Sequence, residues 1–210
     1  MHIVFLNLGL PGTQTYFGKD VQTGGRKLPV PEAYLHATHF AGDGQADLKH
    51  HGGPDKAACV YPYDHYRYWE QVLGGPLEPG AFSENLSVAG ARESEVNLGD
   101  IWQVGQARVQ VCQPRMPCAK LAGKRGHKEL PELIHANGFS GFYLRVLREG
   151  LVRAGGAVTV VERHPAGVTI QFVNELLYKQ RPDRADFERA LAVEALAEAG
   201  RRSLLKRLAL

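Results

Sequence analysis

Short runs of alternating hydrophobic and polar residues fill residues 1–163 of the chain. Glycine and proline separate these runs, which read HIVFLNLG, AYLHATHF, ACVY, ENLSV, DIWQV, ARVQVC, FYLRVL and AVTVVER. A period of two places successive side chains on opposite faces of a strand, and many short strands at this spacing are typical of a barrel or a sandwich. We therefore expect residues 1–163 to form a mainly β domain.

Helical patterns interrupt the strands in this region. The segment DHYRYWEQVL repeats its large side chains at helical spacing. A second segment, KELPELIHAN, ends at Asn137 and is followed by Gly138, a residue type that commonly ends helices. A short helical turn is expected near Pro117. The prediction is a sheet with peripheral helices.

The pattern changes after residues 165–167 and becomes helical. Thr169 and Asp183 have side chains that cap helix N-termini, so one helix is expected after each. Gly200 and Ser203 introduce a third, basic helix that reads SLLKRLAL. Residues 164–210 are therefore predicted to form a small three-helix appendage.

Composition places the chain among ordinary globular proteins, with 44% hydrophobic and 22% charged residues. The chain has 25 basic and 22 acidic residues, and the net charge of +3 is too small to indicate a nucleic-acid partner. Three cysteines, an odd number, and no leader-like start favour a cytoplasmic protein without a disulfide framework. The apolar runs are shorter than the roughly 20 residues that span a bilayer, so no membrane partner is expected.

The segment QPRMPCAKL places a thiol among cations. Cys118 follows a proline at the expected start of a helix, with Arg115 and Lys120 nearby in sequence. Such surroundings favour the thiolate, the form that attacks electrophiles and binds soft metals. The alternative is a small buried side chain at a turn. Cys59 and Cys112 lie in strand-like runs and are expected in the core.

Histidines and aspartates gather in HATHFAGDGQADLKHHGGPD. The segment lacks the paired spacing of zinc ligands, so tight turns and backbone hydrogen bonds explain most of it. His51 differs because Gly52 and Gly53 follow it directly. Two residues without Cβ let the backbone approach a ligand and present amides to an anion. We therefore expect His51, Gly52 and Gly53 at a ligand site.

Four ordered blocks carry a resemblance to a known family: GDGQADLKHHGGPDKA, VYPYDHYRYW, FSENLSV and LGDIWQVGQARVQVCQPRMPCAKL. They resemble the MOSC domain, which is named for the C-terminal domain of molybdenum cofactor sulfurase, and most of all its bacterial YiiM-like branch. The resemblance covers approximately residues 1–163. Residues 164–210 resemble the three-helix domain that often follows MOSC in that branch. It implies a MOSC-type β-barrel with peripheral helices and a C-terminal three-helix domain.

The resemblance also implies a molybdenum cofactor, a molybdopterin that holds molybdenum through its dithiolene. The cysteine that ligates the metal falls on Cys118, and Arg115 is one of the neighbouring cations that would offset the cofactor's negative charge. Asn85 falls on the motif asparagine, whose amide can contact a pterin or a metal-bound oxygen. The motif more usually reads Phe-Gly-Glu-Asn-Leu, and Ser83 replaces its glycine. Either the backbone needs a positive φ and the serine strains it, or the hydroxyl adds a ligand contact.

The function implied by the resemblance is reduction of N-hydroxylated compounds, such as hydroxylamino purines and amidoximes, to amines. His51 or His65 is the expected proton donor. The chain has no dinucleotide fingerprint and no cysteine set for an iron–sulfur cluster, so a separate flavoprotein or iron–sulfur electron donor is expected. Two alternatives stay open: sulfur transfer through a persulfide on Cys118, and a non-catalytic binding module. The oligomeric state is also open.

Overall fold

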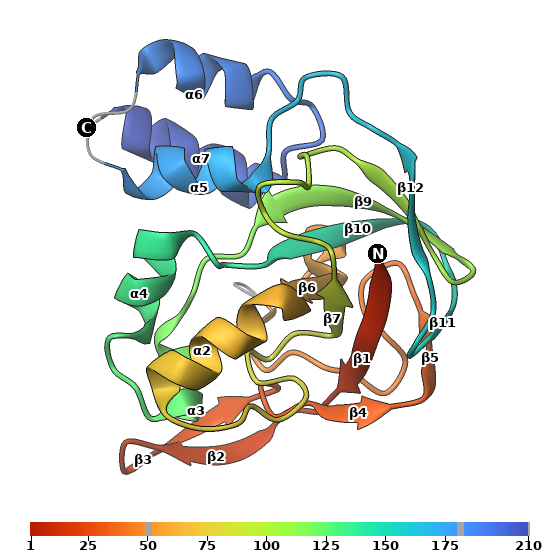
Figure 1. Ribbon diagram of the computed structural model, residues 1–210, viewed down its shortest axis with the longest axis vertical. Helices are drawn as coiled ribbons and strands as arrows, with labels where there is room; N and C mark the ends of the chain where they lie inside the picture. The colour runs from red at the N-terminus through yellow and green to blue at the C-terminus, as the bar shows by residue number, and fades with distance from the viewer. Residues whose placement is uncertain (49–51, 180–182, 210) are drawn as a thin grey trace.

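The alternating runs form strands because every second side chain can enter a common core. The computed structural model describes residues 1–48, 52–179 and 183–209. Its main sheet has eight strands in the spatial order β12, β8, β9, β10, β6, β7, β1 and β4 (Figure 1). Their bounds are β1 His2–Leu8, β4 Leu28–Val30, β6 Ala58–Pro62, β7 Leu86–Ala89, β8 Ile101–Val104, β9 Ala107–Pro114, β10 Phe142–Arg148 and β12 Val158–Glu162.

The strand pairs of this sheet are antiparallel except for β6 and β7, which run parallel. A parallel pair needs a crossover connection. Here the crossover contains the 3-10 helix η2 (Tyr63–His65) and helix α2 (Tyr66–Leu73). The start of β7 therefore lies beside the middle of β6, with Val60 opposite Leu86.

The expectation of a closed β-barrel is wrong for the described part of the chain, because the sheet ends at β12 and β4. The reason lies in β1, which pairs with β4 at Leu6, Asn7 and Leu8. The start of β1 meets the far end of the sheet at an isolated bridge between His2 and Ala157. One bridge does not extend the β12 ladder along β1, so the sheet stays open.

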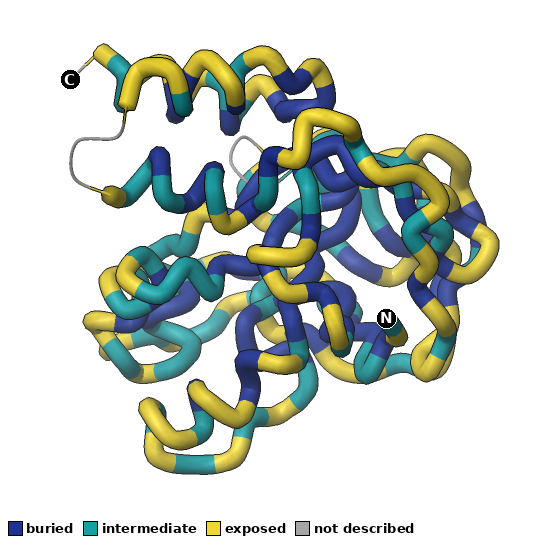
Figure 2. Tube along the Cα trace, turned by 45° about the horizontal axis from the view of Figure 1, so that its top comes forward, coloured by how far each residue is buried: buried dark blue, intermediate teal, exposed yellow. Residues whose placement is uncertain are grey.

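The interior of the curved sheet is filled by one cluster of apolar side chains. Among its largest members are Trp102, Phe40 and Phe142. The rings of Trp102 in β8 and Phe142 in β10 pack edge to face. Figure 2 shows buried segments concentrated along the strands and exposed segments along the loops. This cluster holds the sheet as a fixed support for the loops at its ends.

A second apolar cluster joins the helices beside the sheet. It combines Trp69 of α2, Leu121 of α3 (Ala119–Arg125) and Leu130 of α4 (Leu130–Asn137) with Phe82 from the loop before β7. The two helices expected from sequence here are confirmed, and the expected turn near Pro117 is the start of α3. Because Phe82 is fully buried in this cluster, the loop that follows it is fixed in position.

Two small sheets complete the β part: β5 (Glu32–Leu35) pairs with β11 (Gly150–Arg153), and β2 (Gly12–Tyr16) pairs with β3 (Lys19–Thr23). The β2–β3 hairpin was missed in the sequence analysis, because neither of its faces carries an apolar row. Its turn has positive φ at both Phe17 (49°) and Gly18 (75°), as a two-residue hairpin turn requires. In the sequence, Gly18 was the one residue of this turn that could have indicated it.

Three helices follow the sheet: α5 (Ile170–Tyr178), α6 (Arg184–Leu191) and α7 (Glu198–Leu208). The predicted caps are confirmed, since Thr169 Oγ1 accepts from Phe172 N at 3.0 Å and Asp183 Oδ1 accepts from Ala185 N at 3.1 Å. Helix α7 begins earlier than expected, because the segment before Gly200 is fixed by a hydrogen bond from Ala197 N to Cys112 O. None of the helices in the described ranges is long and apolar enough to cross a membrane.

The Thr169 cap provides a test of how the C-terminal helices are stabilised. Thr169→Ala should lower the free energy of unfolding by about 1 kcal/mol, because one amide at the start of α5 loses its acceptor. Chemical denaturation measures the change. Thr159→Ala, at an exposed position of β12, is the control and should change the stability by less than about 0.5 kcal/mol. Equal losses in the two variants would contradict the capping role.

Candidate functional site

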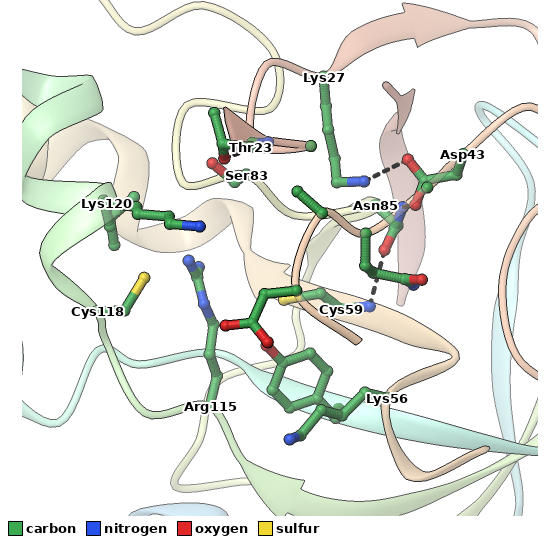
Figure 3. Close-up of a pocket in the computed structure, with 18 of the residues that line it drawn as sticks. Thr23, Lys27, Asp43, Lys56, Cys59, Ser83, Asn85, Arg115, Cys118 and Lys120 are labelled. Carbon is green, nitrogen blue, oxygen red and sulfur yellow. Dashed lines mark hydrogen bonds and ion pairs between the residues drawn. The ribbon is translucent and has the colours of Figure 1, made fainter. Parts of the chain in front are cut away.

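A cleft at the end of the sheet collects four of the predicted site residues. Ser83, Asn85, Arg115 and Cys118 all line it (Figure 3). It encloses roughly 720 Å³ of empty space, part of which is open to solvent. The structure thus brings these four candidate residues to one cleft, whereas their functional roles stay predictions.

The remaining predicted residues do not join this group. His51 lies outside the residues that the structure describes. Gly52 and Gly53 precede the 3-10 helix η1 (Pro54–Lys56), and neither belongs to the described lining of the cleft, although Lys56 does. His65 lines a different cavity, where its Nε2 lies 2.7 Å from Glu93 Oε2. The geometry therefore gives no support to His65 as a proton donor in the cleft.

Cys118 occupies the N-cap position between β9 and α3. Its backbone is extended (φ −121°, ψ 161°), and its carbonyl accepts from Leu121 N at 2.9 Å. In Figure 3 the sulfur points toward the cleft and lies between the side chains of Arg115 and Lys120. The two cations that flank Cys118 in sequence thus also flank it in space, which favours a negative sulfur.

Arg115 places a fixed positive charge beneath the cleft. Its side chain is buried, and Nη1 donates to Phe82 O at 2.5 Å. Burial acts to lower the pKa of Arg115, but neighbouring acidic groups, Cys59 and Tyr143 first among them, act to raise it, and the pKa ends above its ordinary value. The guanidinium therefore stays charged and is held in one position by the loop that also carries Ser83.

Asn85 has a different geometry from the one expected. Its Oδ1 accepts from Cys59 N at 3.1 Å, while its Nδ2 donates to Asp43 Oδ2 at 2.8 Å and to Asn7 O at 3.3 Å. Both amide hydrogens are thus donated to the chain itself. The expected donation to a pterin is not favoured by this arrangement. Asn85 instead ties β1, β6 and the Asp43 loop together at the wall of the cleft.

Asp43 is a residue of the cleft that the sequence analysis did not single out. Its Oδ1 accepts from Gly9 N at 2.8 Å and forms an ion pair with Lys27 Nζ. Both side chains of the pair are buried. Asp43 lies between two glycines of a loop, where an aspartate usually signals only a turn. Its partners, Lys27 and Asn85, are distant in sequence, so no local pattern could identify the role.

Among the residues that the structure describes, the lining of the cleft has a surplus of positive charge. Four cations and two carboxylates belong to this described lining: Lys27, Lys56, Arg115, Lys120, Asp43 and Asp47. One carboxylate already pairs with Lys27. Cations gathered in a partly enclosed cleft raise the local concentration of anions. The arrangement therefore suits an anionic ligand.

The three cysteines have different surroundings. Burial raises the pKa of Cys59 to about 11, and it also raises the pKa of Cys112 above its ordinary value. Both were expected in the core, and both are buried, although Cys59 also lines the cleft. Cys118 is partly exposed and lies beside cations. It is therefore the thiol best placed to react or to bind a metal.

Ser83 has the positive φ of the first alternative, whereas a contact of its hydroxyl with a ligand stays a prediction. Its φ is 62°, a left-handed conformation that strains a serine. Its hydroxyl is also used, since Lys124 Nζ of α3 donates to Ser83 Oγ at 3.4 Å. The same ammonium donates to Gly25 O at 2.9 Å and to Gly80 O at 2.5 Å. Lys124 thus joins α3 to two loops that border the cleft.

Comparisons with known proteins agree with this geometry. The family model of the MOSC domain matches residues 47–159, and that of the YiiM-like 3-alpha helix domain matches residues 168–210. The chain is 46% identical over 206 residues to the uncharacterized protein YflK of Bacillus subtilis (strain 168), covering 98% of this chain and 93% of that one. It is 32% identical over 136 residues to a protein of Gibberella moniliformis (strain M3125 / FGSC 7600) named "Reductase", covering 62% of this chain and 24% of that one.

A solved structure shows that the similarity extends to the fold of nearly the whole chain. The crystal structure of YiiM from Geobacillus stearothermophilus superposes with a TM-score of 0.83 and 37% identity, covering 99% of this chain and 98% of that one. The chain therefore belongs to the MOSC domain family. Its C-terminal three-helix segment places it in the YiiM-like branch of that family.

The strain at Ser83 leads to a prediction about stability. Ser83→Gly should raise the free energy of unfolding by about 0.5–1 kcal/mol, because a left-handed backbone costs ~1–2 kcal/mol and the extra chain entropy of glycine offsets part of the gain. Phe17→Gly relieves the same backbone strain in an exposed turn and is the matched control. Denaturation of both variants is the measurement. A loss in Ser83→Gly alone would show that the contact with Lys124 outweighs the strain.

The cysteines should differ in reactivity. With iodoacetamide at pH 8, Cys118 in the folded protein should be alkylated about 100-fold faster than Cys59 or Cys112, because burial disfavours the thiolate at those two positions. Peptide mass spectrometry after timed quenching measures the three rates. In guanidinium chloride the rates should become similar. Equal protection of Cys118 in the folded protein would contradict its placement at an accessible cleft.

Proposed function

We propose that the chain binds the molybdenum cofactor in this cleft and reduces N-hydroxylated compounds, such as hydroxylamino purines and amidoximes, to amines. The observation that supports this most strongly is the Cys118 thiol pointing into a cleft whose described lining has more cations than carboxylates. A soft sulfur ligand suits molybdenum, and positive charge suits the dithiolene and the phosphate of the pterin. The proposal agrees with membership of the MOSC family.

The residues present fit such a group. Cys118 would bind the metal, and Arg115 and Lys120 beside it would offset negative charge on the ligand sulfurs. Lys27 and Lys56 would serve the more distant anionic part of the cofactor. When bound, the cofactor supplies two-electron redox chemistry and transfer of an oxygen atom. The chain has then to hold the cofactor, orient the substrate and deliver protons.

The walls of the cleft suit a flat organic substrate. Tyr16, Leu121 and Tyr143 contribute aromatic and aliphatic surface to its lining. Burial raises the pKa of Tyr143, so its phenol stays neutral at physiological pH. Such walls exclude water and favour a planar ring, while the cations bind charged groups. A purine or an aromatic amidoxime meets these requirements.

Electrons must be supplied by a second protein. Reduction of R–NHOH to R–NH₂ and water consumes two electrons and two protons. The sequence carries no dinucleotide or iron–sulfur motif, so the donor is proposed to be a separate flavoprotein or iron–sulfur protein. The similarity to the Gibberella protein named "Reductase" supports a reductive reaction in this part of the family.

Replacement of Cys118 tests the proposal. Cys118→Ser changes the volume little but removes the soft ligand, since a hydroxyl stays protonated and binds molybdenum poorly. With protein prepared in a host that makes the cofactor and with reduced methyl viologen as electron source, reduction of a hydroxylamino purine should fall by a factor of about 100 or more. Metal analysis should show molybdenum and pterin in the unsubstituted protein at close to one per chain.

Cys112→Ser is the control, because Cys112 is buried and its Sγ contacts Asp55 O and Tyr143 O rather than the cleft. It should keep activity and lose about 1–3 kcal/mol of stability if its new hydroxyl finds poorer partners. Full activity in Cys118→Ser with metal still bound would refute the ligand role. Labile sulfur on Cys118 without any molybdenum would favour sulfur transfer instead.

A further inference from the structure

The proposed reduction needs protons in the cleft. Of the two expected histidines, His51 lies outside the described residues, and His65 lines a different cavity, where it pairs with Glu93. A different group has the position to supply them. Lys124 lies on α3, six residues after Cys118, and its ammonium reaches the cleft lining through the hydroxyl of Ser83.

The contacts of Lys124 leave one path toward the cleft. Its Nζ donates to the carbonyl oxygens of Gly25 and Gly80, which cannot pass a proton on, and to Ser83 Oγ, which can. Ser83 lines the cleft, and Figure 3 shows its hydroxyl close to that of Thr23 at the cleft wall. The side chain of Lys124 is half-buried, so solvent can restore its proton from the outside.

The charges around Lys124 favour release of a proton near neutral pH. The pKa of Lys124 is lowered to about 8, chiefly by burial; Glu84 and Glu78 act to raise it, and the cations Arg125 and Arg115 act with burial to lower it. A group with such a pKa is mostly protonated at pH 7 and still gives up its proton readily. An anionic ligand in the cleft would move the pKa of Lys124 upward.

We propose that Lys124 and Ser83 form a proton relay into the cleft, in which Ser83 passes its hydroxyl proton to the substrate oxygen that leaves as water and takes a proton from the Lys124 ammonium. The inference rests on the proposed reductase function. One relay event delivers one of the two protons of the reaction. The electrons come from the flavoprotein or iron–sulfur donor, and Lys124 regains its proton from solvent.

The strain at Ser83 supports this role. The family motif more usually has glycine here, and glycine would adopt the observed φ of 62° without cost. Backbone strain of this kind is often found at functional sites, where the surrounding structure holds it in place. A hydroxyl at this position is what a relay needs and what glycine cannot provide. The relay would therefore belong to this chain and to relatives that share the serine.

The pH dependence of kcat tests the relay. With cofactor-loaded protein, reduced methyl viologen and a hydroxylamino purine, kcat should fall as the pH rises through about 8 or above, because Lys124 loses its proton. Ser83→Gly should lower kcat about 100-fold at pH 7 and abolish the fall of kcat at high pH, although the variant folds well. Lys124→Arg keeps the charge and the donors but holds its proton too tightly to transfer it, so it should show the same loss.

Lys128→Met is the matched control, because Lys128 is exposed near the same helix with its Nζ over the ring of Phe17. Lys128→Met should keep both the value of kcat at pH 7 and the fall of kcat at high pH. A purely structural role for Lys124 would be satisfied by arginine, so full activity of Lys124→Arg overturns the relay. So does full activity of Ser83→Gly. Absence of any reduction in the unsubstituted loaded protein overturns the reductase function itself and the relay with it.

A second readout does not use activity. Competitive labelling of amines with acetic anhydride across pH 6–11, read by mass spectrometry on the full chain without cofactor, measures the pKa of Lys124 directly. The expected midpoint is about 8, with Lys128 as the internal reference for an exposed lysine. A midpoint for Lys124 as high as that of Lys128 would overturn the relay even in a protein that proves to be an active reductase.

Discussion

The buried hydrogen bonds of Asn85 are the interaction on which the rest of the site depends. Its side chain satisfies the amide of Cys59 in β6 and donates to Asn7 O in β1 and to Asp43. A polar side chain this deeply buried is stable only when its partners are present, so these three segments must come together for any one of them to be satisfied. Asp43 in turn fixes the ammonium of Lys27 at the cleft. One asparagine thus connects the sheet to the charge of the ligand site.

The site is also stabilised from the opposite side by α3. This helix carries Cys118 at its N-cap and Lys124 near its end, and Lys120 between them donates to Gln22 O in β3 at 2.9 Å. Gly123 lets α3 approach the hairpin, because a Cβ there would lie 2.6 Å from Tyr16 Cβ. The thiol is therefore placed by a helix that is itself fixed to the hairpin and to the loop before β7.

The sequence predicted most of what is local and missed what is not. Most strands of the main sheet, α2, α4 and the caps at Thr169 and Asp183 follow from periodicity and capping, which act within a few residues; the β2–β3 hairpin, which has no apolar row, does not. Closure of the sheet depends on which strand takes the free edge of β1, a long-range competition that no local pattern contains. In the site, Cys118 and Arg115 were found because they lie three residues apart in one unusual segment. Asp43 was missed, because its role comes from partners in other parts of the chain.

Ser83 shows why the stability and the function of this site have to be separated. A serine with a left-handed backbone makes the fold less stable than a glycine would at the same position. The loop tolerates this strain because Phe82 and Glu84, on either side, are fully buried. Glu84 accepts from Tyr66 OH at 2.5 Å, from Ser87 Oγ at 2.7 Å and from Phe82 N at 3.0 Å, which leaves the loop little freedom to relax. The strain is therefore confined to one residue whose hydroxyl faces the cleft. A substitution that improves the fold at this position removes the group through which Lys124 reaches the site.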